Sequence, residues 1–64
     1  MNGKIKNVHT DKGFGFITGA DGVDYFFHQS ELKNCGIGEL ERGRAVTFET
    51  ENGPKGPRAA DVNV

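Results

Sequence analysis

The sequence predicts an all-β domain, a small five-stranded antiparallel barrel, and three observations carry this prediction. At 64 residues the chain has room for only one domain with a thin core. Short segments with strand-like alternation are separated by turn residues, and no long amphipathic helix is visible. Ten glycines and two prolines are spread along the chain, as in a domain with many turns. A closed barrel leaves no strand edge unpaired.

The first strand is expected at residues 4–9. Simple alternation points Ile5 toward the core and Lys6 toward solvent. Val8 breaks the alternation, so either it is exposed or a β-bulge near Asn7 turns it inward. We favour the bulge, which is common at the rims of small barrels.

The second strand is expected at residues 14–18, after a turn at residues 11–13. Alternation places Phe14 and Phe16 on one face and Gly15 and Ile17 on the other, which is the inner face. Glycine on the inner face would let this strand bend sharply.

An Asp-Gly hairpin at residues 19–22 should make the third strand, residues 23–28, an antiparallel neighbour of the second. Both faces of this third strand carry aromatic side chains. The expected outer set is Asp24, Phe26 and His28, and the expected inner set is Val23, Tyr25 and Phe27. The polar members make the first set the outer one, and pairing then brings Phe26 beside the two rings of the second strand.

The second half of the chain contains a long connection and two further strands. Residues 29–44 form the connection, with one helical turn possible at residues 30–32. A strand at residues 45–51 follows, then a turn-rich loop at 52–57 and a last strand at 58–64. The residues expected to point inward are Val46, Phe48, Thr50, Ala60, Val62 and Val64, whereas Thr47, Glu49 and Glu51 are expected outside.

Three phenylalanines, Phe14, Phe16 and Phe26, are therefore expected on one outer face. Other apolar residues already supply the interior, and monomers rarely expose a sizeable apolar patch without a use for it. Each nucleobase offers a π face, and stacking on an aromatic ring contributes about 1–3 kcal/mol per base. The pattern therefore predicts a binding surface for single-stranded nucleic acid, with His28 as a weaker additional platform.

Charged residues border this expected surface. Lys6, Lys12 and Lys55 are candidates for phosphate contacts, and Arg58 for a phosphate or a base edge. Asp24 either accepts hydrogen bonds from bases or pairs with a nearby lysine, and the sequence does not decide between the two. The net charge of −1 indicates that stacking, not bulk electrostatics, dominates binding.

No catalytic, metal or cofactor site is expected. His9, His28 and Cys35 lack the spacing of a closed zinc site, and Cys35 lies in a glycine-rich loop without a recognisable oxyanion donor. A single cysteine permits no intramolecular disulfide, which favours a reducing compartment. The first residues contain no apolar run typical of a signal peptide or membrane span, so we expect a cytoplasmic protein without membrane contact.

Several blocks of the sequence resemble the bacterial cold-shock proteins over essentially the whole chain. Lys12-Gly13-Phe14-Gly15-Phe16-Ile17 is similar to their first ribonucleoprotein motif, and Tyr25-Phe26-Phe27-His28 to the second. Further similar blocks are Gly3-Lys4-Ile5-Lys6, Leu40-Glu41-Arg42-Gly43 and Gly56-Pro57-Arg58-Ala59-Ala60. The resemblance implies a single cold-shock domain over residues 1–64 with an OB-type barrel. It also implies a protein that binds single-stranded RNA or DNA, favours pyrimidine-rich stretches and acts as an RNA chaperone without hydrolysing ATP. We expect the protein to be a monomer.

Three positions depart from the pattern of the cold-shock proteins. Asn7 stands where the family usually has a tryptophan, and Gln29 and Ile37 stand where it usually has phenylalanines. These are stacking positions, so the resemblance predicts weaker binding than is typical. The alternative is a protein-interaction or structural module that keeps the barrel and has lost most of its affinity for nucleic acid.

Overall fold

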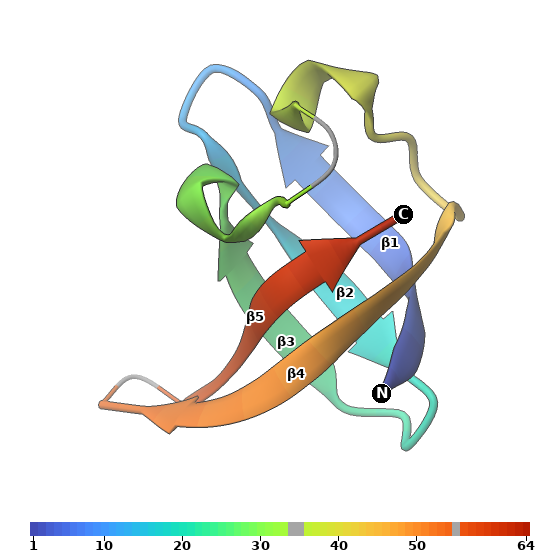
Figure 1. Cartoon of the computed structure of the whole chain (residues 1–64), viewed down its shortest axis with the longest axis vertical. Coiled ribbons are helices and arrows are strands. Elements are labelled where there is room, and N and C mark those ends of the chain that lie inside the picture. Colours follow the sequence, from blue (N-terminus) through green and yellow to red (C-terminus); the bar gives the residue numbers. More distant parts are fainter. Residues whose placement is uncertain (34–35, 55) are drawn as a thin grey trace.

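The computed structural model describes residues 1–33, 36–54 and 56–64 and shows a closed barrel of five strands (Figure 1). The strands are β1 (Asn2–His9), β2 (Phe14–Gly19), β3 (Asp24–His28), β4 (Ala45–Gly53) and β5 (Gly56–Asn63). Two short 3₁₀ turns, η1 (Gln29–Glu31) and η2 (Ile37–Glu39), lie in the long connection between β3 and β4. The predicted all-β barrel is confirmed.

The strands follow the order β1-β2-β3-β5-β4 around the barrel, and β4 closes the ring by pairing with β1. Four seams are antiparallel, but β3 and β5 pair in parallel. The sequence pattern predicted antiparallel pairing throughout, and this seam is the exception. Five is an odd number, so strand direction cannot alternate at every seam of a closed five-stranded ring. At least one parallel seam is required.

The predicted bulge in β1 is confirmed. The register between β1 and β2 shifts between Ile5 and Asn7, so β1 carries one extra residue at this point. Val8 then lies opposite Gly15 and packs, half buried, against the core. The bulge therefore turns Val8 inward and leaves the next residue, His9, on the outer side.

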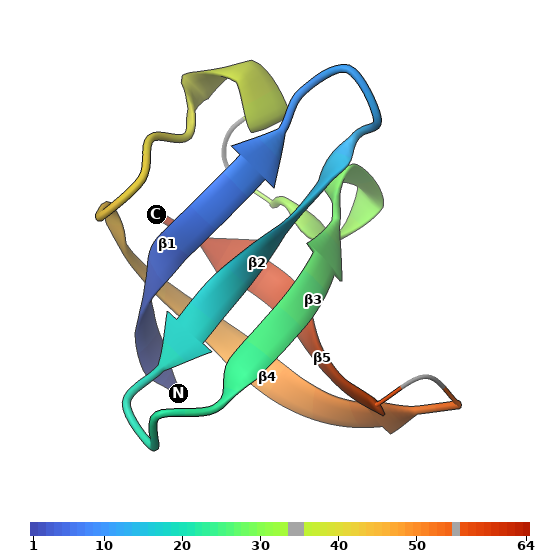
Figure 2. The same cartoon turned by 180° about the vertical axis from the view of Figure 1, so that it is seen from behind.

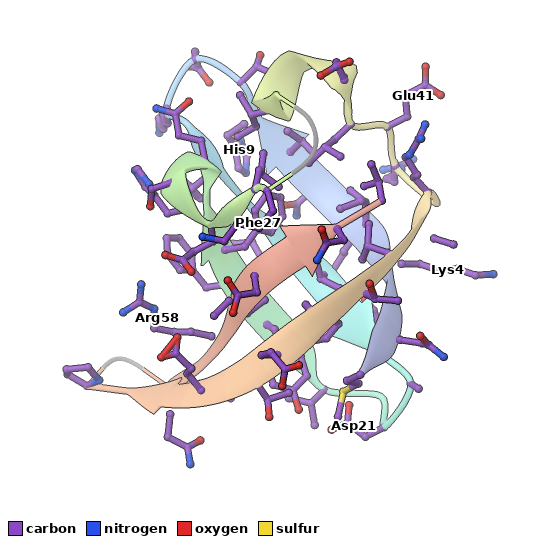
Figure 3. The ribbon with its side chains drawn as sticks, in the orientation of Figure 1. Lys4, His9, Asp21, Phe27, Glu41 and Arg58 are labelled. Carbon is purple, nitrogen blue, oxygen red and sulfur yellow. The ribbon has the colours of Figure 1, made fainter. Side chains whose placement is uncertain are left out.

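The core lies inside the barrel and is formed by residues from all five strands and from Leu40 in the long connection. Its buried members are Ile5, Ile17, Tyr25, Phe27, Leu40, Val46, Phe48, Ala59, Ala60 and Val62. Phe27 can be followed inside the barrel in Figure 3. The inward positions predicted for Ile5, Ile17, Tyr25, Phe27, Val46 and Phe48 are confirmed.

Two residues expected inside are exposed. Val23 is 39% exposed because it belongs to the turn and precedes the first residue of β3. Thr50 is exposed because the far part of β4 pairs only with β5 and extends beyond the barrel body, where neither face meets the core (Figure 1).

The end of the β4–β5 ribbon also differs from the expectation. β4 continues to Gly53 and β5 begins at Gly56, so the two strands extend into the region predicted as a loop at 52–57. Ala59 and Ala60 are both buried, which breaks strict alternation in β5. The half-buried Val64 packs against the core, in agreement with its expected inward position.

The turn between β2 and β3 is held by one aspartate. Gly22 has a φ of +82°, which suits the Asp-Gly hairpin that the sequence predicts. The Asp21 carboxylate accepts hydrogen bonds from the Val23 amide at 3.1 Å and from the Tyr25 hydroxyl at 2.7 Å. The Tyr25 bond, with a smaller contribution from Val23, lowers the pKa of Asp21, and the same carboxylate raises the pKa of Tyr25.

These pKa shifts predict a pH window for the contribution of this hydrogen bond to stability. The lowered pKa of Asp21 gives a contribution that is complete above about pH 4 and is lost as pH falls through the folded-state pKa. The raised pKa of Tyr25 gives a contribution to stability that is complete below about pH 10 and is lost as pH rises through the folded-state pKa of Tyr25. The measurement is the melting temperature between neutral and acidic pH. In Asp21→Asn and in Tyr25→Phe, the melting temperature should fall less steeply with decreasing pH than in wild type. If the melting temperature of both variants falls with pH as steeply as that of wild type, the Asp21–Tyr25 hydrogen bond does not provide this pH dependence.

Gly15 lies where no side chain fits. A β-carbon at this position would be 2.6 Å from the Asn7 carbonyl oxygen and 2.8 Å from the Phe27 ring. Gly15→Ala is therefore expected to destabilise the fold by about 1–3 kcal/mol or more, measured by urea unfolding. Gly38→Ala is the matched control, because a β-carbon there meets nothing within 4 Å. Equal midpoints for the two variants would contradict the close approach of Phe27.

Candidate functional site

The outer face of β1, β2 and β3 carries a cluster of phenylalanine rings. Figure 2 shows these strands side by side, with β2 in the middle. Phe14 and Phe16 come from β2 and Phe26 from β3, where Phe26 pairs directly with Phe16. All three side chains are half buried. We call these three residues the ring platform.

The rings of the platform contact one another at different angles. The centroids of Phe14 and Phe26 are 5.5 Å apart with the planes inclined by 35°. Phe16 meets both edge-on, at 5.8 Å and 72° to Phe26 and at 6.4 Å and 83° to Phe14. Two rings are thus broadly aligned and the third stands across them. The three phenylalanines that the sequence predicted to meet are brought together.

The interior explains why these rings face outward. Gly15 and Ile17, which alternate with the phenylalanines of β2, are buried, and the Phe27 ring fills the space over Gly15. A β2 strand shifted by one residue would have to place phenylalanine rings in this occupied space. The alternation of β2 is therefore fixed by the core.

Asp24 and Lys6 form an ion pair beside the ring platform. The Lys6 ammonium donates to Asp24 Oδ2 at 2.5 Å, and the Thr18 hydroxyl donates to Oδ1 at 3.1 Å. The bond from Lys6, followed by that from Thr18, lowers the pKa of Asp24. Of the two roles considered for Asp24, the structure shows the lysine pair, and both its oxygens already have donors.

Arg58 approaches the platform from β5. It pairs with Phe26 across the parallel seam, and Figure 3 shows its side chain pointing away from the barrel. A hollow of about 510 Å³ lies here, lined by Phe16, Phe26, Pro54, Gly56, Pro57 and Arg58. Its lining combines two phenylalanines with an arginine, whose guanidinium group can donate to a phosphate or a base edge. Lys55, also predicted for this site, lies outside the described residues.

The opposite end of the platform is formed by the end of β3 and the β1–β2 turn. His28 is exposed, and its Nδ1 accepts the Ser30 amide at 3.2 Å, which leaves Nε2 as the N–H donor of the neutral ring. Gln29 is exposed and its side chain lies against Gly13. Lys12 is exposed in the turn. The histidine and lysine predicted here can therefore reach a ligand.

Two of the substituted stacking positions are partly buried. Asn7 lies opposite Phe16 and is half buried, and among the described residues its Oδ1 has no hydrogen-bond partner. Ile37 is half buried and packs against the core. Neither provides a ring to the surface that Phe16 occupies.

His9 is the residue near the platform that the sequence reasoning missed, because it was considered only as a metal ligand. Its exposed ring lies 5.0 Å from the Phe14 ring with the planes inclined by 41°. The signal was present in the predicted bulge. Once Val8 turns inward, alternation places His9 on the outer face.

Other surface features are less suited to ligand chemistry. A larger hollow of about 910 Å³ lies between the start of β1 and β4, and none of the described residues that line it is aromatic. Within residues 1–33, 36–54 and 56–64, no three His, Cys, Asp or Glu side chains gather in a way that could hold a metal ion. The described part of the chain also has no helix long and apolar enough to cross a membrane.

Comparison with known proteins identifies the family. The model of the "'Cold-shock' DNA-binding domain" matches residues 1–64. The chain belongs to the cold-shock domain family. Cold shock protein 2 of Lactiplantibacillus plantarum is 48% identical over 61 residues, which cover 95% of this chain and 92% of that protein. The cold shock-like protein of Thermotoga maritima is 45% identical over 64 residues, covering 100% and 97%. Cold shock-like protein CspB of Escherichia coli is 48% identical over 63 residues, covering 97% and 89%.

Membership of the cold-shock domain family agrees with the barrel and with the resemblance seen in the sequence. The family consists of nucleic-acid-binding proteins and not of enzymes. The two blocks that resemble the family's ribonucleoprotein motifs lie mainly in β2 and β3, the strands that carry the ring platform.

Proposed function

We propose that this cold-shock domain binds single-stranded RNA or DNA by stacking bases on the ring platform. The observation that carries the proposal is the contact among Phe14, Phe16 and Phe26 on the outer face of the barrel. Half-buried rings held by a sheet lose little conformational freedom when a base stacks on them. A duplex hides the faces of its bases inside the helix, so the platform selects single strands.

In this proposal, contacts between basic side chains and phosphates add to the binding free energy, but base stacking contributes more. The net charge is −1, and Lys6 already contacts Asp24. Lys12 and Arg58 are exposed at opposite ends of the platform, and we assign them to phosphates, with a base edge as the alternative for Arg58. With Lys55 as a third cation, about three phosphates are neutralised, and log K falls with log salt with a slope of roughly −2.

Further parts of the proposal follow from the family. We assign the protein a preference for pyrimidine-rich strands and an RNA-chaperone role without ATP hydrolysis, exercised as a monomer in the cytoplasm. The single cysteine is consistent with this reducing compartment. Because Asn7, Gln29 and Ile37 provide no rings, the affinity is weaker than in typical members of the family.

A second function is favoured by the same three positions. If each lost ring removes about 1 kcal/mol or more, and the effects add, affinity falls by a factor of about one hundred or beyond. The domain would then serve as a structural or protein-interaction module.

One titration separates the two functions. The chain has no tryptophan, so the signal comes from a fluorescent label on a pyrimidine-rich heptanucleotide, added as a single strand or as a duplex. Micromolar binding to the single strand, with much weaker binding to the duplex, supports the proposed function. No binding up to millimolar concentration of the single strand contradicts it and favours the structural module.

Phe16→Ala should weaken single-strand binding about 5- to 150-fold, because it removes one stacking surface of about 1–3 kcal/mol. The measurement is the anisotropy titration, with the urea midpoint recorded to show that the variant is folded. Val23→Ala is the control, since Val23 is an apolar residue exposed in the hairpin turn. If both variants bind like wild type, the platform is not the binding surface.

Restoring the missing rings should strengthen binding. Asn7→Trp combined with Gln29→Phe is expected to raise affinity about fivefold or more for each base that gains a partner. Thr47→Phe is the matched control, because it adds a ring on the exposed face of β4. Equal affinities for the double variant and wild type would show that the ligand does not pass over these positions.

A further inference from the structure

We infer that His9 forms an additional stacking subsite for one nucleobase, at the β1 edge of the ring platform. This inference rests on the proposed function and extends it to a residue outside both ribonucleoprotein motifs. His9 is exposed, lies opposite Phe14 in the β1–β2 register, and has its ring 5.0 Å from the Phe14 ring. Four rings from three strands thus form one continuous surface.

The backbone holds His9 in a fixed position. Its carbonyl oxygen accepts hydrogen bonds from the Lys12 amide at 3.1 Å and the Gly13 amide at 2.9 Å, which close the turn between β1 and β2. Contact with Phe14 limits the side chain on one side. The His9 backbone is therefore fixed, and the contact with Phe14 restricts the ring on one side before a base arrives, which reduces the entropy lost on binding.

The tilt between the two rings implies a separate subsite. The planes of His9 and Phe14 are inclined by 41°, and offset stacking needs planes that are nearly parallel. One flat base cannot lie on both rings at once. A base on His9 is therefore an extra one, next to the base that stacks on Phe14, and the ligand footprint grows by one nucleotide.

The bulge in β1 determines which residue of this strand supplies a ring. Asn7 and His9 share the outer face, but Asn7 is half buried and has no ring, whereas His9 is exposed. The residue of β1 that offers a ring to a base is therefore His9, two residues closer to the β1–β2 turn than Asn7. Lys12 is exposed in that turn, so the phosphate of the extra nucleotide is directed toward the Lys12 ammonium.

The test is a titration with oligothymidylates that grow by one nucleotide at a time. For wild type, affinity should rise at the length that brings a base onto His9. His9→Ala should lose this last rise, about fivefold or more, and bind shorter oligomers like wild type. His9→Phe should keep the rise, and Thr10→Ala, in the same turn, should not change it. Lys12→Ala should reduce the salt slope by about 0.7 for oligomers long enough to reach His9.

A direct readout is the NMR signal of the His9 ring protons. A stacked base should shift these protons upfield in the long oligomer and leave them unchanged in the short one. Wild-type-like binding of His9→Ala at every length overturns the inference. So does an equal loss at every length, which would mean that His9 only supports Phe14.

The failure of this inference is distinguishable from failure of the proposed function. If Phe16→Ala weakens binding at all lengths and His9→Ala at none, the platform binds bases and only the His9 subsite is refuted. If wild type binds no oligothymidylate, both are refuted.

Discussion

The close contact between the Phe27 ring and Gly15 is the constraint on which the site depends. This contact leaves no interior space for a side chain between Phe14 and Phe16. Because side chains alternate along a strand, an inner glycine obliges both phenylalanines to stand outside. The core and the binding surface are therefore two results of one packing arrangement, and the residues that stabilise the barrel also orient the platform.

The odd number of strands in the barrel also affects the site. A closed barrel of five strands requires a parallel seam, and here it joins β3 to β5. That seam places Arg58 beside Phe26, although the two are far apart in sequence. The hollow formed with Phe16 and Pro57 is thus a product of barrel closure. In this domain the topology brings a cation to the rings despite a net charge that is slightly negative.

Much of this arrangement was predictable, because alternation and turn chemistry are local. The register of the β2–β3 hairpin, the bulge that turns Val8 inward and the outward position of the platform all follow from residue order. What failed depends on the surroundings of a segment. Thr50 continues the alternating pattern of β4, but at this point the paired strands β4 and β5 extend beyond the barrel, so neither face of β4 meets the core. The bulge already indicates that His9 faces outward, but its ring contact with Phe14 across the β1–β2 seam is not visible in one strand alone. Asp24 had two chemically reasonable partners, and only the fold shows Lys6 within reach.

The Lys6–Asp24 pair has a consequence for the proposed recognition of a single strand. Lys6 carries its counterion within the same chain, held by the β1–β2–β3 sheet at 2.5 Å. Under the proposed function, a phosphate that takes Lys6 from Asp24 would exchange one anion for another at the Lys6 ammonium. The same exchange would free an Asp24 oxygen, which could then accept a hydrogen bond from an N–H group on a base edge. One exchange would then recognise both the phosphate charge and the identity of the base. The Asp24 carboxylate is the ion-pair partner of Lys6 in the free protein and would be a hydrogen-bond acceptor for the base in the complex.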